Sequence, residues 1–371
     1  MAKSSILSAL IAGDNELPYF VSESSNTFLH YFNIKMHAYV RSLRGISENA
    51  LEGMQKDFFI DRINEVIERL KETLRVYLEG YPAAAYVVFN AMIENTELAS
   101  ELIELRTVVL PRNHSLFRIR KEYDLIPLKR RYNGFQRNFS GLDLFHVPFE
   151  KRRGIGTNRF SISGFPCVYA SDSLMTSWAE CMLQPDDPFH AVCFRNHRPL
   201  YVIDMVPLPL SAIKREADKH SDKPLVISNL NHSLLSYAIL YPLILACHSK
   251  VRFVPAYTGE VQFKSEYIVP QLLLEWYRTH KVMVDGVRYL SCSVQEKFSE
   301  GAFSKYNYVI PVIETKERGY CDHLVHNFSS SPVYTHVIRR HVMLDTLVHI
   351  EKQILRKAFV PVGESIQPNI P

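Results

Sequence analysis

The sequence predicts an α+β protein, in which an all-helical N-terminal region precedes a mixed β core with flanking helices. Apolar residues in the first third of the chain recur at helical spacing. Beyond about residue 115, short β-like runs alternate with helical windows. Hydrophobic residues make up 47% of the 371 positions and charged residues 22%, a globular balance that excludes wholesale disorder.

The N-terminal helices are predicted from periodicity and punctuation. Between Ile60 and Tyr77, apolar residues recur at steps of three and four and define one helical face. Gly80 is expected to end this helix and Pro82 to open the next, over 83–93. A third helix is expected over 97–109. The heptad-like face is also compatible with a homo-oligomer.

Strands and helices are expected to interleave in the rest of the chain. Strands are predicted over 116–118, 159–162, 167–170, 191–194, 200–206, 286–290 and 309–313. Helices are predicted over 174–182, 234–247, 268–280 and 333–356, with a charged surface loop over 214–224. We expect three segments: a helical region 1–114, a catalytic domain 115–315 and a C-terminal extension 316–371.

Charge and cysteine usage favour a cytoplasmic protein without a nucleic-acid or membrane partner. The net charge of +4 is too small to indicate nucleic-acid binding by itself. Basic residues cluster at 129–131 and 151–153, which we read as solvated loops, with anion binding as the alternative. The six cysteines show no CxxC spacing, and we expect no signal peptide, so free thiols are predicted. The longest apolar stretch, 234–247, is too short to span a bilayer.

Common nucleotide and metal motifs are incomplete. Gly154-Ile-Gly156 opens like a dinucleotide-binding fingerprint, but Arg159 stands at the third glycine position. The sequence contains no P-loop. Cys321, His323 and His326 have metal-binding side chains at short spacing but lack an evident fourth ligand, so we expect no metal.

The segment 157–180 carries a pattern of its own. A polar start leads to a Gly-Phe-Pro turn and a short strand ending at Tyr169. A helix is expected next, with a serine or aspartate of 171–173 as its N-cap. Glu180 would lie two turns into that helix. Tyr169 and Glu180 are therefore expected at nearby ends of one cleft.

Together with two other motifs, this segment resembles the RES domain, a family named after its arginine, glutamate and serine. The matching elements are Leu116-Phe-Arg-Ile, Arg159-Phe-Ser with Gly164–Tyr169 and Glu180, and Asp285-Gly-Val-Arg-Tyr-Leu-Ser291. The three motifs occur in the family's order and cover about residues 115–310. Residues 1–114 and the tail beyond 315 lie outside the resemblance.

The resemblance implies an ADP-ribosyltransferase-like fold and an NAD-consuming toxin of a bacterial toxin–antitoxin pair. NAD would be the substrate, and cleavage of its nicotinamide–ribose bond by hydrolysis or phosphorolysis would deplete the cell of NAD. A cognate antitoxin is the implied protein partner. An ADP-ribosyltransferase that modifies a protein is one alternative, and a non-catalytic interaction module is another.

The family's catalytic residues carry over to Arg118, Glu180 and Ser291, and Arg159 and Tyr169 match as NAD-binding residues. Glu180 would stabilise the oxocarbenium-like cation that forms when nicotinamide leaves. Arg118, with Arg159 in reserve, would clamp the pyrophosphate, and Tyr169 would stack on nicotinamide. Ser291 would hydrogen-bond the nicotinamide or ribose. The acceptor of ADP-ribose, the antitoxin and the role of the N-terminal helices stay open.

Each assignment has a structural alternative. Arg118 could be the solvent-facing residue of a strand, and Glu180 a charge on a helix surface. Tyr169 could belong to the core. Convergence of the side chains of Arg118, Glu180 and Ser291 on one pocket would favour the catalytic interpretation.

Overall fold

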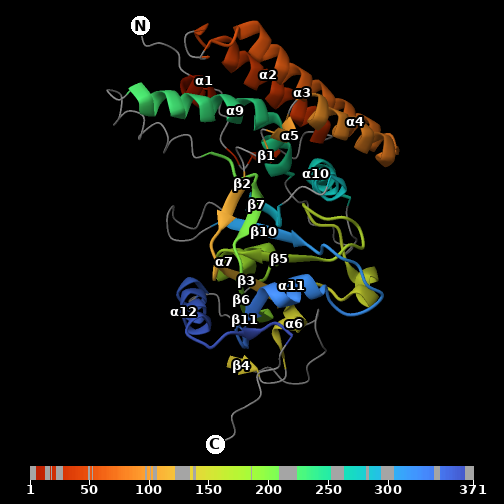
Figure 1. Cartoon of the computed structure of the whole chain (residues 1–371), viewed down its shortest axis with the longest axis vertical. Helices are drawn as coiled ribbons and strands as arrows, with labels where there is room; N and C mark the ends of the chain where they lie inside the picture. The colour runs from red at the N-terminus through yellow and green to blue at the C-terminus, as the bar shows by residue number, and fades with distance from the viewer. Residues whose placement is uncertain are drawn as a thin grey trace, which may run out of the picture. The chain divides into compact units, whose positions relative to one another are not determined.

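The computed structural model divides the chain into two units of packing (Figure 1). It describes residues 6–363 except 13–16, 18, 22–27, 49–50, 52, 97, 101, 103–106, 122–133, 137–138, 185, 209–223, 252–262, 281–283, 294–304 and 338–342. The first unit joins 1–107, 158–160 and 205–282, and the second joins 108–157, 161–204 and 283–371. The predicted α+β class is confirmed, because N-terminal helices precede a mixed sheet with flanking helices.

This grouping cuts across the three segments expected from the sequence. Residues 205–282 pack with the N-terminal helices, although they follow several strands of the sheet in the sequence. The tail beyond 316 packs with the sheet. Segments that are far apart in the sequence therefore pack into the same unit.

Helices make up most of the first unit. They are α1 (Ile6–Ala12), α2 (Phe28–Arg44), α3 (Lys56–Leu78), α4 (Pro82–Asn95), α5 (Leu98–Ser100), α9 (Pro224–His248) and α10 (Ile268–Thr279), with a short 3-10 helix at Ser265–Tyr267. The strands β1 (Tyr19–Val21) and β8 (Ser249–Val251) pair in parallel, so the region expected to be all helical contains a strand.

The longest predicted N-terminal helix is confirmed as α3. Its apolar face is buried, with Ile63 and Leu70 fully inside. Gly80 follows the helix with a φ of +94°, a conformation that glycine adopts without a steric penalty. Pro82 is the first residue of α4. An N–H at this position has no partner within the helix, so its absence in proline costs no hydrogen bond.

The second unit is built around a sheet of eleven strands. They are β2 (Thr107–Leu110), β3 (Ser115–Lys121), β4 (Gly134–Gln136), β5 (Cys167–Ser171), β6 (Pro188–Asn196), β7 (Leu200–Asp204), β9 (Gly286–Leu290), β10 (Tyr306–Pro311), β11 (Phe328–Ser330), β12 (Val333–Val337) and β13 (Val360–Pro361). The main order is β13-β11-β6-β3-β5-β10-β9-β7-β2, and β12 pairs with β4 and β6. The sheet is mixed, because β7 and β9 are parallel and β5 and β10 antiparallel.

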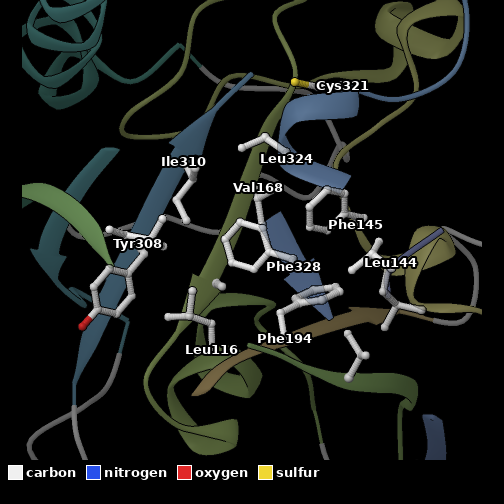
Figure 2. Packing of buried hydrophobic residues seen from close by; sticks show 14 of the residues in the cluster. Leu116, Leu144, Phe145, Val168, Phe194, Tyr308, Ile310, Cys321, Leu324 and Phe328 are labelled. Atoms are coloured by element: carbon white, nitrogen blue, oxygen red, sulfur yellow. The ribbon is translucent and has the colours of Figure 1, made fainter. Parts of the chain in front are cut away.

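Short helices cover both faces of this sheet. They are α6 (Gly141–Leu144), the 3-10 helix Phe149–Gly154, α7 (Leu174–Glu180), α11 (Asp322–Asn327) and α12 (Met343–Leu355). On one face, Leu116, Val168 and Phe194 form a core with Phe145 and Phe328 (Figure 2). On the other face, alternate residues of β3 pack against α7 and α12.

Two predicted helices are partly wrong. Within 97–109, the described residues include the short helix α5, and β2 already begins at Thr107, because Thr-Val-Val is β-branched and joins the sheet. Residues 333–356 divide into the strand β12 and the helix α12. The stretch Val333–Val337 is β-branched and aromatic, and it pairs with β4 and β6.

The predicted strand 159–162 is also wrong, since these residues form a loop. Arg159 is bound to backbone carbonyls, and Gly164 turns the chain with a φ of +70°. The predicted helix 234–247 lies inside the longer helix α9. The predicted loop 214–224 lies outside the described residues, apart from its last position.

Candidate functional site

Helix α7 carries Glu180 at its last position. After β5 ends at Ser171, the chain enters the helix through Ser173, whose hydroxyl accepts a hydrogen bond from the N–H of Thr176 at 3.2 Å. Ser173 is therefore the N-cap among the three candidates in the sequence. Seven residues make about two turns, and Glu180 leaves the helix half-buried.

Two neutral donors from separate parts of the chain hold the carboxylate of Glu180. Ser291, which follows β9, donates its hydroxyl to Oε1 at 2.5 Å. Asn307 of β10 donates from Nδ2 to the same oxygen at 2.7 Å. The structure thus brings together two of the predicted site residues, Glu180 and Ser291, which are 111 positions apart in the sequence.

A third polar side chain orients Asn307. Ser171 lies opposite Asn307 in the β5–β10 register and donates its hydroxyl to Oδ1 at 2.6 Å. An amide whose oxygen accepts on one side turns its NH₂ to the other, which here faces Glu180. Ser171, Ser291 and Asn307 are each at most 3% exposed. We call these three residues the polar floor.

The polar floor orients the charge of Glu180 without neutralising it. Both donors end on Oε1, and neither donor carries a charge. No hydrogen bond to the other oxygen, Oε2, is found among the described residues. A carboxylate oriented in this way can accept hydrogen bonds from hydroxyl groups or stabilise a cation that forms beside it.

Asn307 and Ser171 were missed by the sequence reasoning. The expected strand began at residue 309, so Asn307 fell outside it. A signal was nevertheless present, because Asn307 stands in the run Tyr-Asn-Tyr-Val-Ile-Pro, where the other residues are apolar or aromatic. A buried polar side chain in such a strand needs a hydrogen-bond partner.

Tyr169 lies on the face of the sheet that carries the polar floor. It is two residues from Ser171 along β5, and side chains at this spacing point the same way. Its partner in β10 is Val309, two residues from Asn307. Tyr169 is half-buried.

The side chain of Arg118 leaves β3 on the face of the sheet opposite to the one that carries the polar floor. Its neighbours in β3, Phe117 and Ile119, belong to the core cluster under α7. Arg118 alternates with them and pairs with Val192 of β6, which belongs to the cluster on the other face. The structure therefore does not place the backbone of Arg118 beside the Glu180–Ser291 pair.

The guanidinium of Arg118 is nevertheless unusual. Its Nη1 is buried and has no hydrogen-bond partner among the described residues. Burial, and after it the charge of Arg120, lowers the pKa of Arg118 to about 9. Cys181 and Tyr169 act in the opposite direction on this pKa, so both lie within electrostatic reach of the guanidinium. A buried cation of this kind favours an anionic ligand.

Helix α7 also provides hydrogen bonds to carbonyl groups along one edge of β3. In the described register, β5 pairs with β3 at a single position, Phe117 opposite Ser171. The hydroxyl of Ser177 donates to the Phe117 carbonyl at 2.8 Å, and the thiol of Cys181 to the Ile119 carbonyl at 3.3 Å. Side chains of α7 and of its C-cap, Cys181, thus satisfy carbonyls that a longer pairing with β5 would otherwise satisfy.

Arg159 belongs to the first unit. It is 7% exposed, and its Nη1 donates to the carbonyls of Cys247 at 3.0 Å and Ser249 at 2.9 Å. The ring of Tyr267 lies under the guanidinium at 5.0 Å. These contacts give Arg159 a packing role in its own unit, and its binding of NAD stays a prediction.

The described residues contain no group of three or more His, Cys, Asp or Glu side chains that could hold a metal ion. Cys321 is buried at the N-cap of α11, where its N–H donates to Nε2 of His146 at 3.0 Å. The six cysteines all lie in the described part of the chain, and none of them forms a disulfide. No helix in the described part of the chain is long and apolar enough to cross a membrane.

Fold and site together define an α+β protein in which one half-buried carboxylate rests on a buried floor of neutral donors. A protein of Bacillus subtilis (strain 168), described as "Putative toxin YopC", is 30% identical to this chain over 288 residues. The match covers 76% of the chain and 61% of that relative. No family model matches the chain, and no solved structure matches it. The chain is thus a distant relative of a protein described as a toxin.

Proposed function

We propose that this protein is a toxin that cleaves the nicotinamide–ribose bond of NAD. The observation that carries the proposal is the carboxylate of Glu180 on its polar floor, in contact with Ser291. The ordered resemblance to the RES domain and the distant relationship to a protein described as a toxin support it.

In the proposed reaction, the bond between C1′ of the ribose and the pyridinium nitrogen breaks. Its electron pair stays with nitrogen, so nicotinamide leaves as a neutral molecule and needs no proton. The sugar becomes an oxocarbenium-like cation, which the negative charge of Glu180 stabilises. Water then bonds to C1′ and releases a proton, giving ADP-ribose. If phosphate attacks instead, the product is the ADP-ribose 1″-phosphate.

The surrounding residues have distinct roles in this proposal. Ser291 and Asn307 hold Oε1 of Glu180, and Oε2 accepts hydrogen bonds from the ribose hydroxyls. Tyr169 stacks on nicotinamide from the same face of the sheet. Although its backbone lies on the other face of the sheet, Arg118 is the candidate for binding the pyrophosphate, because its guanidinium is within electrostatic reach of Tyr169. Its buried Nη1, which has no hydrogen-bond partner among the described residues, supports this role. Arg159 is the weaker candidate, because two of its hydrogen bonds already go to backbone carbonyls.

The test is loss of NAD on incubation with the purified full chain and with Glu180→Gln. The variant keeps the shape of the side chain but removes its charge. We expect the rate to fall by roughly 10²–10³-fold, as for the loss of a group that stabilises transition-state charge. Glu317→Gln is the matched control, because Glu317 is exposed in the same unit. Equal rates in wild type and Glu180→Gln would refute the proposed site.

Product analysis identifies the acceptor of the sugar. Free ADP-ribose indicates water, the 1″-phosphate indicates phosphate, and label transferred from NAD to a polypeptide indicates a protein target. In the toxin proposal, expression of the wild-type chain depletes the cell of NAD and stops growth. A cognate antitoxin would restore growth.

A further inference from the structure

The C-terminal helix α12 packs on α7, the helix that carries Glu180. Leu347, Ile350 and Ile354 lie at helical spacing on α12 and are at most 1% exposed. They share one core cluster with Leu174 and Trp178 of α7. This contact joins α7 to a segment that lies outside the resemblance to the RES domain.

A partly buried hydrogen bond also joins the two helices. Oε2 of Glu351 in α12 accepts a hydrogen bond from the N–H of Leu174 at 2.8 Å. Leu174 is the first residue of α7, and the first four N–H groups of a helix lack partners within the helix. The local N-cap, Ser173, satisfies Thr176. A residue 177 positions away therefore satisfies Leu174.

Helix α7 is too short to be stable on its own. Isolated helices of fewer than about 12 residues are marginal in water, and α7 has seven. Its position must come from tertiary contacts. These are the hydrogen bonds of Ser177 and Cys181 to β3 at one side, and α12 with Glu351 at the N-terminal end.

We propose that Glu351 is a positioning residue, and that α12 is a brace that fixes where α7 presents Glu180. The inference rests on the proposed function, because Glu180 is the group being positioned. Without the bond to Leu174, the first turn of α7 frays and Glu180 shifts from the polar floor. Displacements of about 1 Å in catalytic groups cost up to about 10²-fold in rate.

The experiment compares Glu351→Ala, Glu351→Gln and Lys352→Ala in the full chain. Glutamine keeps an oxygen that can accept from Leu174, whereas alanine removes it. Lys352 is the next residue on the same helix and is exposed, so it serves as the control. Two quantities are measured: kcat and KM for NAD cleavage, and amide hydrogen exchange of peptides covering 173–181 and 56–78.

Glu351→Ala is expected to speed exchange in 173–181 by about tenfold, as for a lost helix cap, without changing 56–78. We expect kcat to fall about tenfold, while KM stays within about twofold, because the defect lies in the placement of a group that acts in the transition state. Glu351→Gln should restore both quantities, and Lys352→Ala should change neither.

The outcomes separate this inference from the proposed function. Unchanged exchange in 173–181 overturns the brace, whatever the activity. Faster exchange with a wild-type kcat overturns the positioning role of Glu351. If the wild-type chain consumes no NAD, the proposed function fails and the positioning role fails with it. Faster exchange in Glu351→Ala would then still support the brace as a structural contact.

Discussion

Glu180 accepts hydrogen bonds from Ser291 and Asn307 on one oxygen, and Ser171 in turn orients Asn307. A hydrogen bond to a charged group contributes about 1.5–3 kcal/mol, roughly twice as much as a bond between two neutral groups. In the proposed reaction, these bonds hold the carboxylate where positive charge develops on the sugar. Their effect should therefore appear in the rate of the chemical step.

The loss of kcat on replacing a residue of the polar floor should depend on whether that residue bonds Glu180 directly or through Asn307. We expect Ser291→Ala and Asn307→Ala to lower kcat by roughly tenfold or more, since each removes a donor to a charged group. Ser171→Ala acts only through Asn307 and should cost about threefold. The Ser171→Ala/Asn307→Ala double variant should be no slower than Asn307→Ala alone. Steady-state kinetics of NAD loss measures all four, and additive effects of Ser171 and Asn307 would contradict this network.

Part of this site was expected from the resemblance of three ordered motifs to the RES domain. Glu180 and Ser291 were named on the basis of that resemblance, and the structure places them in contact. Asn307 was missed because its contribution depends on the register of β10 against β5, which no local pattern specifies. Strand alternation puts Arg118 on the face opposite the polar floor, and this could be derived only after the core clusters on both sides of β3 were known.

At the level of elements, helices and strands were predicted well where a single periodicity persists. Helix α3 has an unbroken 3.6-residue pattern over 23 residues and was predicted correctly. The segment 333–356 changes from a period of two to a period of 3.6 within a few residues, so one helix was expected where β12 and α12 are found. Short strands such as β2 are stabilised by pairing partners distant in sequence, which local patterns do not reveal.

Strand β9 approaches β10 so closely at Gly286 that no larger residue fits. A Cβ at this position would lie 2.2 Å from the carbonyl oxygen of Val309. Gly286→Ala must therefore push β9 away from β10, and we expect a loss of about 1–3 kcal/mol in the free energy of unfolding. Gly156→Ala is the matched control, because a Cβ there meets nothing within 4 Å. Urea unfolding measures both, and equal stabilities of the two variants would contradict the close approach.

The contact between α7 and α12 should respond to pH through Glu351. Burial raises the pKa of Glu351 above its ordinary value of about 4.3, while the bond from Leu174 acts in the opposite direction. The raised pKa means that ionisation opposes folding, so the stabilisation present below about pH 4.3 is lost as pH rises through the raised value. Glutamine has no charge to bury.

The Tm of Glu351→Gln relative to wild type is thus expected to increase between about pH 4 and about pH 8. Thermal unfolding over this range measures the difference. A difference that stays constant, or that decreases with rising pH, would show that Glu351 is not a partly buried acid with a raised pKa.

For the whole molecule, the sequence predicted the α+β class and the low overall charge, but it did not reveal how distant segments pack. Residues 205–282 join the N-terminal helices, and the C-terminal segment joins the sheet unit that holds Glu180. The match to "Putative toxin YopC" covers 76% of this chain, so it extends well beyond a single motif. Activity as a toxin is proposed for the full chain, and the full chain is the form to test.

The most direct measurement is the release of nicotinamide from NAD by the purified full chain and by Glu180→Gln, with the products quantified. We predict that the wild type releases nicotinamide in equal amount to an ADP-ribosyl product. Glu180→Gln should do so roughly 10²–10³-fold more slowly. An NAD pool left intact by the wild type, or consumed equally fast by Glu180→Gln, would contradict the role of Glu180 in NAD cleavage.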